Sequence, residues 1–207
     1  MEKEQFEEKE SIELIADMIA RTKHRLCIGD GNIMLLWGYL AVAVALLVWV
    51  LLVVLQHPAV NWLWFLIWII GGSITPKLAR KSRDKSGVTS YVDRVSNSVW
   101  SLVGWCSIIA TFMCLGFMLF AAKDCWGVMM VFALLIVGMA EAVQGIVLQE
   151  RSLIVGGAVG VVCGIFIMCC LVGGIMLYAH WCMPLFILAF VAMMIVPGHI
   201  INHKAKK

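Results

Sequence analysis

Glu141 is the side chain best placed to do chemistry inside a membrane. It lies within a long apolar run, and Gln144 follows it one helical turn later. An ionisable group in hydrocarbon is costly, and by default it marks a functional site that faces the protein interior. Because the apolar runs hold no Lys or Arg at comparable depth, we expect the neutral, protonated carboxyl to be favoured. Two roles stay open for the pair: an interhelical hydrogen bond that joins helices, or a proton or ligand site.

Two other groupings are candidates for a metal site and for a cross-link. His199 and His203 are four residues apart near the end of the last apolar run, so they share one helix face. Two ligands do not make a metal site, and we predict none there; histidines wetted at the membrane interface are the alternative. Cys125 and Cys182 fall in two connections on one side of the membrane, where an oxidising compartment would permit a disulfide.

Sequence motifs of the common enzyme classes are missing. The chain has no HExxH zinc motif, no GxSxG nucleophile elbow and no phosphate-binding loop. Its apolar runs also lack the pair of carboxylates that an intramembrane aspartyl protease needs. We therefore expect no enzymatic activity and no cofactor.

Composition indicates the environment that must position these side chains. Of 207 residues, 62% are hydrophobic and 14% are charged, whereas soluble domains have about 25% charged residues. Crossing the hydrocarbon core takes roughly 20 apolar residues in a helix. The sequence predicts an all-α fold, a polytopic transmembrane bundle of about six helices within residues 33–203. The predicted spans are 33–55, 59–75, 99–122, 126–148, 153–178 and 183–201.

Lys and Arg are sorted to one side of this predicted bundle. Fifteen of the sixteen lie in the N-terminal segment, the loop 76–98, the connection after the fourth span and the tail 204–207. Lys123 alone falls on the other side. Because cytoplasmic loops are enriched in these residues, we expect both termini to be cytoplasmic. The short connections on the other side predict three antiparallel hairpins: first span with second, third with fourth, and fifth with sixth.

The basic loop begins with a run of cations. Its members are Lys77, Arg80, Lys81, Arg83 and Lys85. Such a run attracts anionic lipid head groups, and it is also the ordinary signal that sets topology. Membrane lipids are therefore expected partners. Nucleic acid is not, because the positive charge is already sorted by membrane side.

A glycine repeat in the fifth span predicts close helix packing. Gly156, Gly160 and Gly164 recur every fourth residue and leave a smooth groove along one helix face. The helix that fills this groove can belong to the same chain or to a second copy in a homo-oligomer. We favour the first.

Residues 1–32 predict a cytoplasmic amphipathic helix followed by a turn. Ser11 can cap this helix, whose apolar residues fall near one stripe. We expect it to lie at the membrane interface, or to dock on the basic loop or on a protein partner. The segment SIELIADMIARTKHRL leading into LLWGYL resembles uncharacterised bacterial multi-pass inner-membrane proteins over about the first 40 residues. The resemblance implies a bacterial cytoplasmic membrane and carries over no activity and no site residues.

Two functions stay open from the sequence. Our first interpretation is a non-enzymatic regulatory or partner-binding membrane component. The alternative is a small-solute or ion transporter or channel with Glu141 as an intramembrane protonatable site. A transporter needs a polar cavity or broken helices near the midplane, whereas a packing protein should enclose Glu141 between tight helices.

Overall fold

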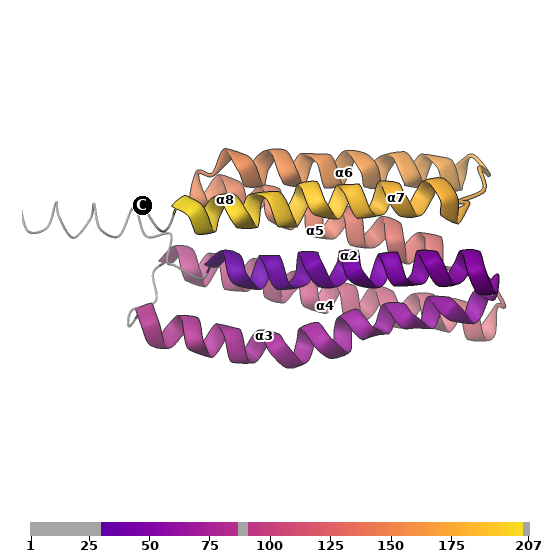
Figure 1. Cartoon of the computed structure of the whole chain (residues 1–207), viewed down its shortest axis with the longest axis horizontal. Coiled ribbons are helices and arrows are strands. Elements are labelled where there is room, and N and C mark those ends of the chain that lie inside the picture. Colours follow the sequence, from indigo (N-terminus) through magenta and orange to yellow (C-terminus); the bar gives the residue numbers. More distant parts are fainter. Residues whose placement is uncertain (1–29, 87–90, 205–207) are drawn as a thin grey trace, which may run out of the picture.

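The structure, a computed structural model, describes residues 30–86 and 91–204, and it describes side chains for 31–80 and 94–204. Most of these residues are helical and none of them forms a strand, which confirms the predicted all-α bundle. Six helical segments of the described part are long and apolar enough to cross a membrane, as in a multi-pass membrane protein. They lie side by side along the long axis of the molecule (Figure 1). The helix predicted within residues 1–32 lies outside the described residues. Residues 30–32 are described, and they form the start of the first span.

The helices follow one another with short connections. Their bounds are α2 (Asp30–Leu55), η1 (Pro58–Trp64), α3 (Phe65–Ser86), α4 (Tyr91–Phe120), α5 (Trp126–Leu148), α6 (Arg151–Val172), α7 (Ala179–Phe190), η2 (Val191–Ile195) and α8 (Val196–Lys204). The 3₁₀ helix η1 with α3 makes the second span, and α7, η2 and α8 together make the last span.

Several spans differ in length from their predicted bounds. The second continues through Pro76 to Arg80, because α3 carries the proline inside the helix. The fifth ends at Val172 rather than at residue 178. Its chain leaves the helix at Gly173 and Gly174, and Gly174 adopts a left-handed φ of 71° that favours glycine. The last span accordingly begins earlier than predicted, at Ala179.

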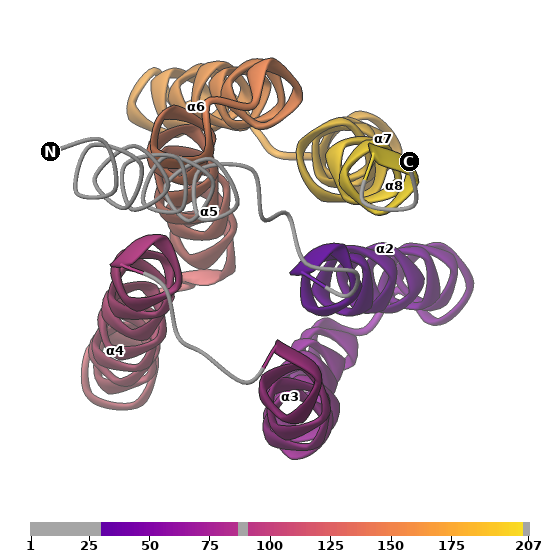
Figure 2. The same ribbon diagram turned by 90° about the vertical axis from the view of Figure 1, so that its left-hand side faces the viewer.

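Viewed along the bundle axis, the helices form a ring in the order α2, α3, α4, α5, α6 and α7–α8 (Figure 2). The helices of each predicted hairpin contact each other, but the most extensive packing is between α5 and α6, which belong to different hairpins. The last span closes the ring by packing on both α6 and α2. Between α3 and α4 the packing is weakest: among the described residues α3 packs mainly on α2 and α4 mainly on α5.

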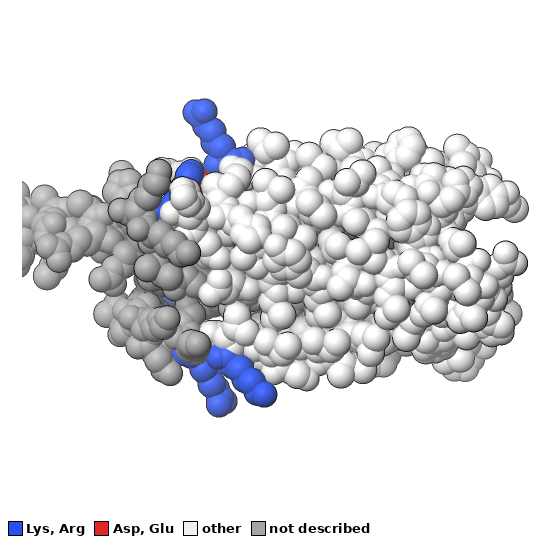
Figure 3. All heavy atoms as spheres, viewed as in Figure 1, with Lys and Arg blue, Asp and Glu red and all other residues white. Residues whose placement is uncertain are grey.

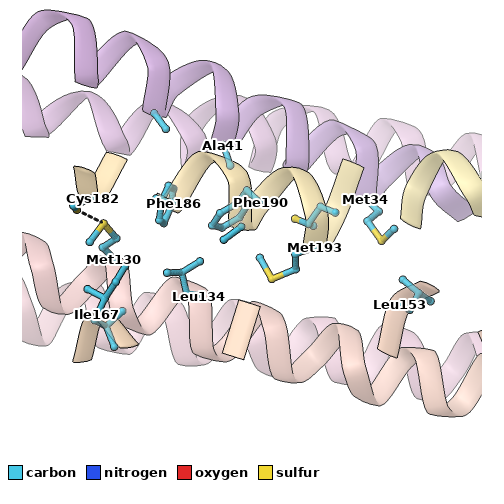
Figure 4. Close-up of a cluster of buried hydrophobic side chains, with 14 of the residues drawn as sticks. Met34, Ala41, Met130, Leu134, Leu153, Ile167, Cys182, Phe186, Phe190 and Met193 are labelled. Atoms are coloured by element: carbon cyan, nitrogen blue, oxygen red, sulfur yellow. Dashed lines mark hydrogen bonds between the residues drawn. The ribbon is translucent and has the colours of Figure 1, made fainter. Parts of the chain in front are cut away.

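The apolar core lies where α2, α5, α6 and the last span meet. Leu134, Leu153, Ile167 and Met193 are fully buried there, each from a different turn of these helices. Figure 4 shows Met193 directed from the last span toward α5, opposite Leu134. Because lipid tails are as apolar as these side chains, close packing rather than the hydrophobic effect must stabilise this contact.

The last span is interrupted by the single π turn η2. The Val196 N–H donates to the carbonyl of Val191, five residues back instead of four. Pro197 follows immediately and has no N–H to donate. Such turns are rare and occur frequently at functional sites.

Candidate functional site

A cavity of about 1040 Å³ lies inside the ring of helices. Its wall is built mainly from α2, η1, α3, α4, α5 and the last span, with Leu171 of α6 and the connection before α7 at one end. Clefts that hold drug-sized molecules measure about 300–1,000 Å³, so this cavity can hold a small organic solute. It adjoins the weak packing between α3 and α4.

The cavity extends over most of the length of the bundle. Ile33 and Asn97 line it near the end at which α2 begins and α8 ends, which we call the basic end. Asn61 and Tyr178 line it near the opposite end. A solute inside it would therefore lie within the membrane-spanning part of the protein.

Tryptophans dominate the larger side chains on the wall. They are Trp37, Trp64, Trp68, Trp100 and Trp126, contributed by α2, η1, α3, α4 and α5. Scattered hydroxyls and amides add hydrogen-bonding groups, among them Thr75, Asn97, Thr111 and Gln144. Asp124 is the one acidic residue on the described wall, which carries no Lys, Arg or His. Aromatic faces of this kind stack on flat apolar molecules and attract cations.

Two indole hydrogen bonds hold the wall tryptophans in place. Trp37 Nε1 donates to Thr75 Oγ1 at 3.0 Å and joins α2 to α3. Trp100 Nε1 donates to Gln144 Oε1 at 2.6 Å and joins α4 to α5. An indole N–H inside a membrane finds no water to bond, so these acceptors fix the orientation of both rings.

An aromatic cluster of Trp62, Phe65 and Trp126 bridges the ring near the opposite end. Trp62 stacks on Phe65 with ring centres 5.6 Å apart, and it meets Trp126 edge to face at 5.9 Å. The cluster brings η1 and α3 together with α5, across the side where α3 and α4 pack weakly. Phe65 and Trp126 also line the cavity, so the cluster bounds it at that end.

Glu141 is enclosed elsewhere, on the face of α5 that packs against α6. Its side chain is 0% exposed, and neither carboxyl oxygen has a hydrogen-bond partner among the described residues. The same buried stripe of α5 carries Leu134, Gly138 and Gly145. Glu141 does not line the cavity, so the structure places it behind the cavity wall.

The predicted pairing of Glu141 with Gln144 in one site is wrong. Gln144 lines the cavity and accepts from Trp100, whereas Glu141 faces the α6 side of its helix. Three residues of α-helix leave two side chains about 60° apart around the axis, which is enough to put them in different surroundings here.

The glycine groove of α6 is filled by helices of the same chain, as we favoured. A Cβ on Gly156 would lie 2.9 Å from the carbonyl oxygen of Ala192. The Cα of Gly138 lies 3.3 Å from the Cβ position of Gly160, and Leu135 packs against Gly164. The groove therefore receives α5 on one side and the last span on the other.

The remaining candidates have other neighbours. His199 Nε2 shares a hydrogen bond of 2.7 Å with the Tyr39 hydroxyl on α2, and the described residues contain no group of three or more His, Cys, Asp or Glu that could hold a metal. Cys125 and Cys182 are both free thiols, which contradicts the candidate disulfide between them. Cys182 instead donates to Met130 Sδ at 3.5 Å inside the core.

Cations gather at the basic end of the bundle, where Figure 3 shows them at both the upper and the lower edge. Lys77 and Arg80 are exposed there, as lipid head-group binding requires; the side chains of Lys81, Arg83 and Lys85 lie outside the described part. Lys204 of α8 forms an ion pair with the buried carboxylate of Glu150, the residue directly before α6. Asn202 donates to Asn32 at 2.9 Å and ties α8 to the start of α2.

Sequence reasoning did not single out Trp37, Trp100 or Glu150. A tryptophan well inside a predicted span is a usable signal, because its N–H needs an acceptor on a neighbouring helix. Glu150 carried no such signal, since it reads as one more charge in a short connection. The site thus consists of a Trp-lined cavity and, behind its wall, an enclosed carboxyl.

Comparison of the chain with models of protein families, with curated proteins and with solved structures gives no match.

Proposed function

We propose that this protein is a membrane transporter of a small lipophilic solute, which it holds in the Trp-lined cavity. The observation that carries the proposal is a partly open cavity of about 1040 Å³ that residues of all six spans line. A bundle built only for packing has no need of such a space, because an empty cavity forfeits packing contacts. The interrupted last span adds support, since broken helices are typical of transporters.

The solute is neutral or carries a single positive charge. The described wall offers indole faces, a few hydroxyls and amides, and Asp124 as its acidic group. With no Lys, Arg or His on that wall, an anion would be desolvated without a counter-charge, which is costly. A planar aromatic cation gains most, because it both stacks on the tryptophans and is attracted to their faces.

The solute enters from the lipid, between α3 and α4. These two helices pack weakly against each other among the described residues, and the cavity wall includes residues of both, such as Thr75 and Ser107. The outer face of α4 exposes large apolar side chains, including Phe112 and Leu119, that suit contact with acyl chains. A lipophilic molecule dissolved in the bilayer would thus reach the cavity without crossing water.

We place the protein in a bacterial cytoplasmic membrane with both termini on the cytoplasmic side. The sorting of Lys and Arg to the basic end supports this orientation, and the resemblance of the N-terminal segment supports the bacterial membrane. Anionic lipids are its expected partners at that end, through exposed cations such as Lys77 and Arg80. We propose no enzymatic role.

A non-enzymatic regulatory or partner-binding role is the second candidate. What favours it is the enclosure of Glu141 between tightly packed helices, with no exposed path to its carboxyl among the described residues. In that case a protein partner or a second copy of the chain would be recognised through the outer helix faces, and the cavity would bind no solute.

A matched pair of glycine substitutions on α4 separates the two functions. Gly104 lines the cavity and Gly116 does not, and an added Cβ meets nothing within 4 Å at either position. Gly104→Phe therefore adds a ring at the cavity wall with no clash at its Cβ, whereas Gly116→Phe adds the same ring elsewhere. The measurement is saturable binding of a planar aromatic monocation dye to the protein in nanodiscs of zwitterionic lipid.

We expect Gly104→Phe to weaken dye binding by about tenfold or more, which corresponds to about 1.4 kcal/mol, and Gly116→Phe to leave it unchanged. Equal affinities for both variants and the unsubstituted protein would contradict the assignment of the cavity as the solute site. Absence of saturable binding by a panel of neutral and cationic dyes would favour the regulatory role instead.

A further inference from the structure

We propose that Cys114 and Cys125 form a reversible disulfide at the opposite end of the bundle, which fixes the last turns of α4 to the start of α5. The bond needs no solute in the cavity, so it does not rest on the proposed transport. It does rest on the proposed orientation, which exposes this end to the compartment outside the cytoplasm. Disulfides persist in such oxidising compartments and are rare in the cytoplasm.

The short connection between α4 and α5 brings these two cysteines together. Cys114 lies near the end of α4, which closes at Phe120, and Cys125 is the N-cap residue of α5. The Lys123 N–H donates to the carbonyl of Phe117 at 3.4 Å, so the connection folds back along the last turn of α4. The chain then continues antiparallel to α4 and carries Cys125 toward the level of Cys114.

Burial and direct contact make these two residues a thiol pair. Cys114 is 7% exposed and Cys125 is 9% exposed. Their thiols are within side-chain hydrogen-bonding contact of each other. A disulfide requires the two sulfurs to approach to about 2.0 Å. Cys125 lies outside the regular helix, with φ −115° and ψ 8°, and its side chain caps no helix N–H. A small shift of the connection therefore closes the remaining distance.

Other described cysteines have different surroundings. Cys182 donates to Met130 inside the core, and Cys106 lies on α4 nearer the basic end. On α6, Cys169 and Cys170 are adjacent in the helix and point about 100° apart around its axis, so they do not face each other. The contact between α4 and α5 therefore holds the pair of described thiols that is best placed to join.

The oxidant is a disulfide of another molecule. Cys125 adjoins the exposed residues 121–124, so an oxidant at this end of the bundle reaches it first. The Cys125 thiolate attacks one sulfur of the oxidant, which releases one thiol and leaves a mixed disulfide on Cys125. The Cys114 thiolate then attacks the Cys125 sulfur and releases the second thiol. Two electrons pass to the oxidant, and the two cysteine protons end on the two released thiols.

The bond acts on a helix that has one main neighbour. Among the described residues α4 packs mainly on α5 and only weakly on α3. A covalent bond near the end of α4 therefore holds that part of the helix in place, beside the cavity-lining residues Ala110, Thr111 and Asp124. Closing a loop of the chain also stabilises the folded state, because it restricts the unfolded chain. We therefore expect the oxidised protein to be more stable than the reduced protein.

Peptide mass spectrometry tests the pair, because trypsin cleaves after Lys123 and separates the two cysteines. The full chain in nanodiscs is treated with oxidised glutathione, its remaining thiols are alkylated, and it is digested without reductant. We expect a disulfide between peptides 95–123 and 124–151. The link should remain in the matched control Cys106→Ser and be lost in Cys114→Ser, where glutathione should stay on Cys125. Cells that are quenched with acid and alkylated before lysis should contain the same link.

The oxidised protein should also unfold at a higher fraction of denaturing detergent than the reduced protein, and Cys114→Ser should show no such gain. Equal resistance of the two forms would refute the fixing of α4. Glutathione that stays on Cys125 in the unsubstituted protein, or two thiols that remain unmodified, would overturn the pair. A link that forms in nanodiscs while both thiols are free in the quenched cells would overturn the outward placement. None of these results bears on dye binding by Gly104→Phe, which tests the cavity separately.

Discussion

Gly157 of α6 has no space for a side chain, and its substitution measures how closely α5 and α6 approach. A Cβ at this position would lie 2.5 Å from both the amide nitrogen of Ala142 and the carbonyl oxygen of Gly138. Ordinary contacts of a Cβ begin near 3.4 Å, so Gly157→Ala must move the two backbones apart by roughly 1 Å. Neither contact is a flexible side-chain end that can turn away.

Overpacking of this kind costs about 1–3 kcal/mol, and replacing glycine by alanine in a helix returns up to about 1 kcal/mol. With the full gain in helix propensity, the expected net loss for Gly157→Ala is therefore up to about 2 kcal/mol. Gly116→Ala on α4 is the matched control, because its Cβ meets nothing within 4 Å and only the gain in helix propensity remains.

The assay is reversible unfolding in mixed micelles with rising fractions of denaturing detergent, followed by far-UV circular dichroism. We expect Gly157→Ala to unfold at a lower fraction than the unsubstituted protein, and Gly116→Ala at an equal or higher one. If the two alanine variants have the same stability, α5 and α6 do not approach as closely as described, and the enclosure of Glu141 fails with them.

Two further variants probe contacts that join the helices. Trp100→Phe removes the hydrogen bond to Gln144 and should lower the free energy of unfolding by about 1 kcal/mol. Trp105 lies on the same helix and is 66% exposed, so Trp105→Phe should not lower it. Equal melting curves for the two variants would refute the hydrogen bond. Lys204→Gln breaks the ion pair with Glu150. Because Lys204 is 52% exposed, we expect the free energy of unfolding to fall by about 1 kcal/mol, and by less in high salt. Thermal unfolding at two salt concentrations tests this.

The membrane architecture could be predicted from the sequence because it depends on local quantities. Apolar run length decides which segments span, and the sorting of Lys and Arg separates the two ends. The repeat of Gly156, Gly160 and Gly164 likewise indicated a close helix contact, which α5 and the last span provide. In each case the signal lies within one stretch of the chain.

The candidate site could be predicted only in part, because it depends on which helices become neighbours. Glu141 was identified from its depth in an apolar run, but nothing local indicates that it faces α6 while Gln144 faces the cavity. The cavity itself arises from the weak packing between α3 and α4, a relation between two faces distant along the chain. The π turn beside Pro197 also depends on packing, since a proline alone predicts a bend without its direction.

Labelling by a lipophilic photoreactive solute tests the central claim most directly, because α4 presents one face to the cavity and another to lipid. Trp100, Val103 and Ser107 line the cavity, whereas Trp105 and Phe112 are exposed on the outside. After photolysis in nanodiscs and peptide mass spectrometry, the account predicts labels on the cavity face that a non-reactive competitor removes. Labels confined to the outer face and insensitive to the competitor would contradict it.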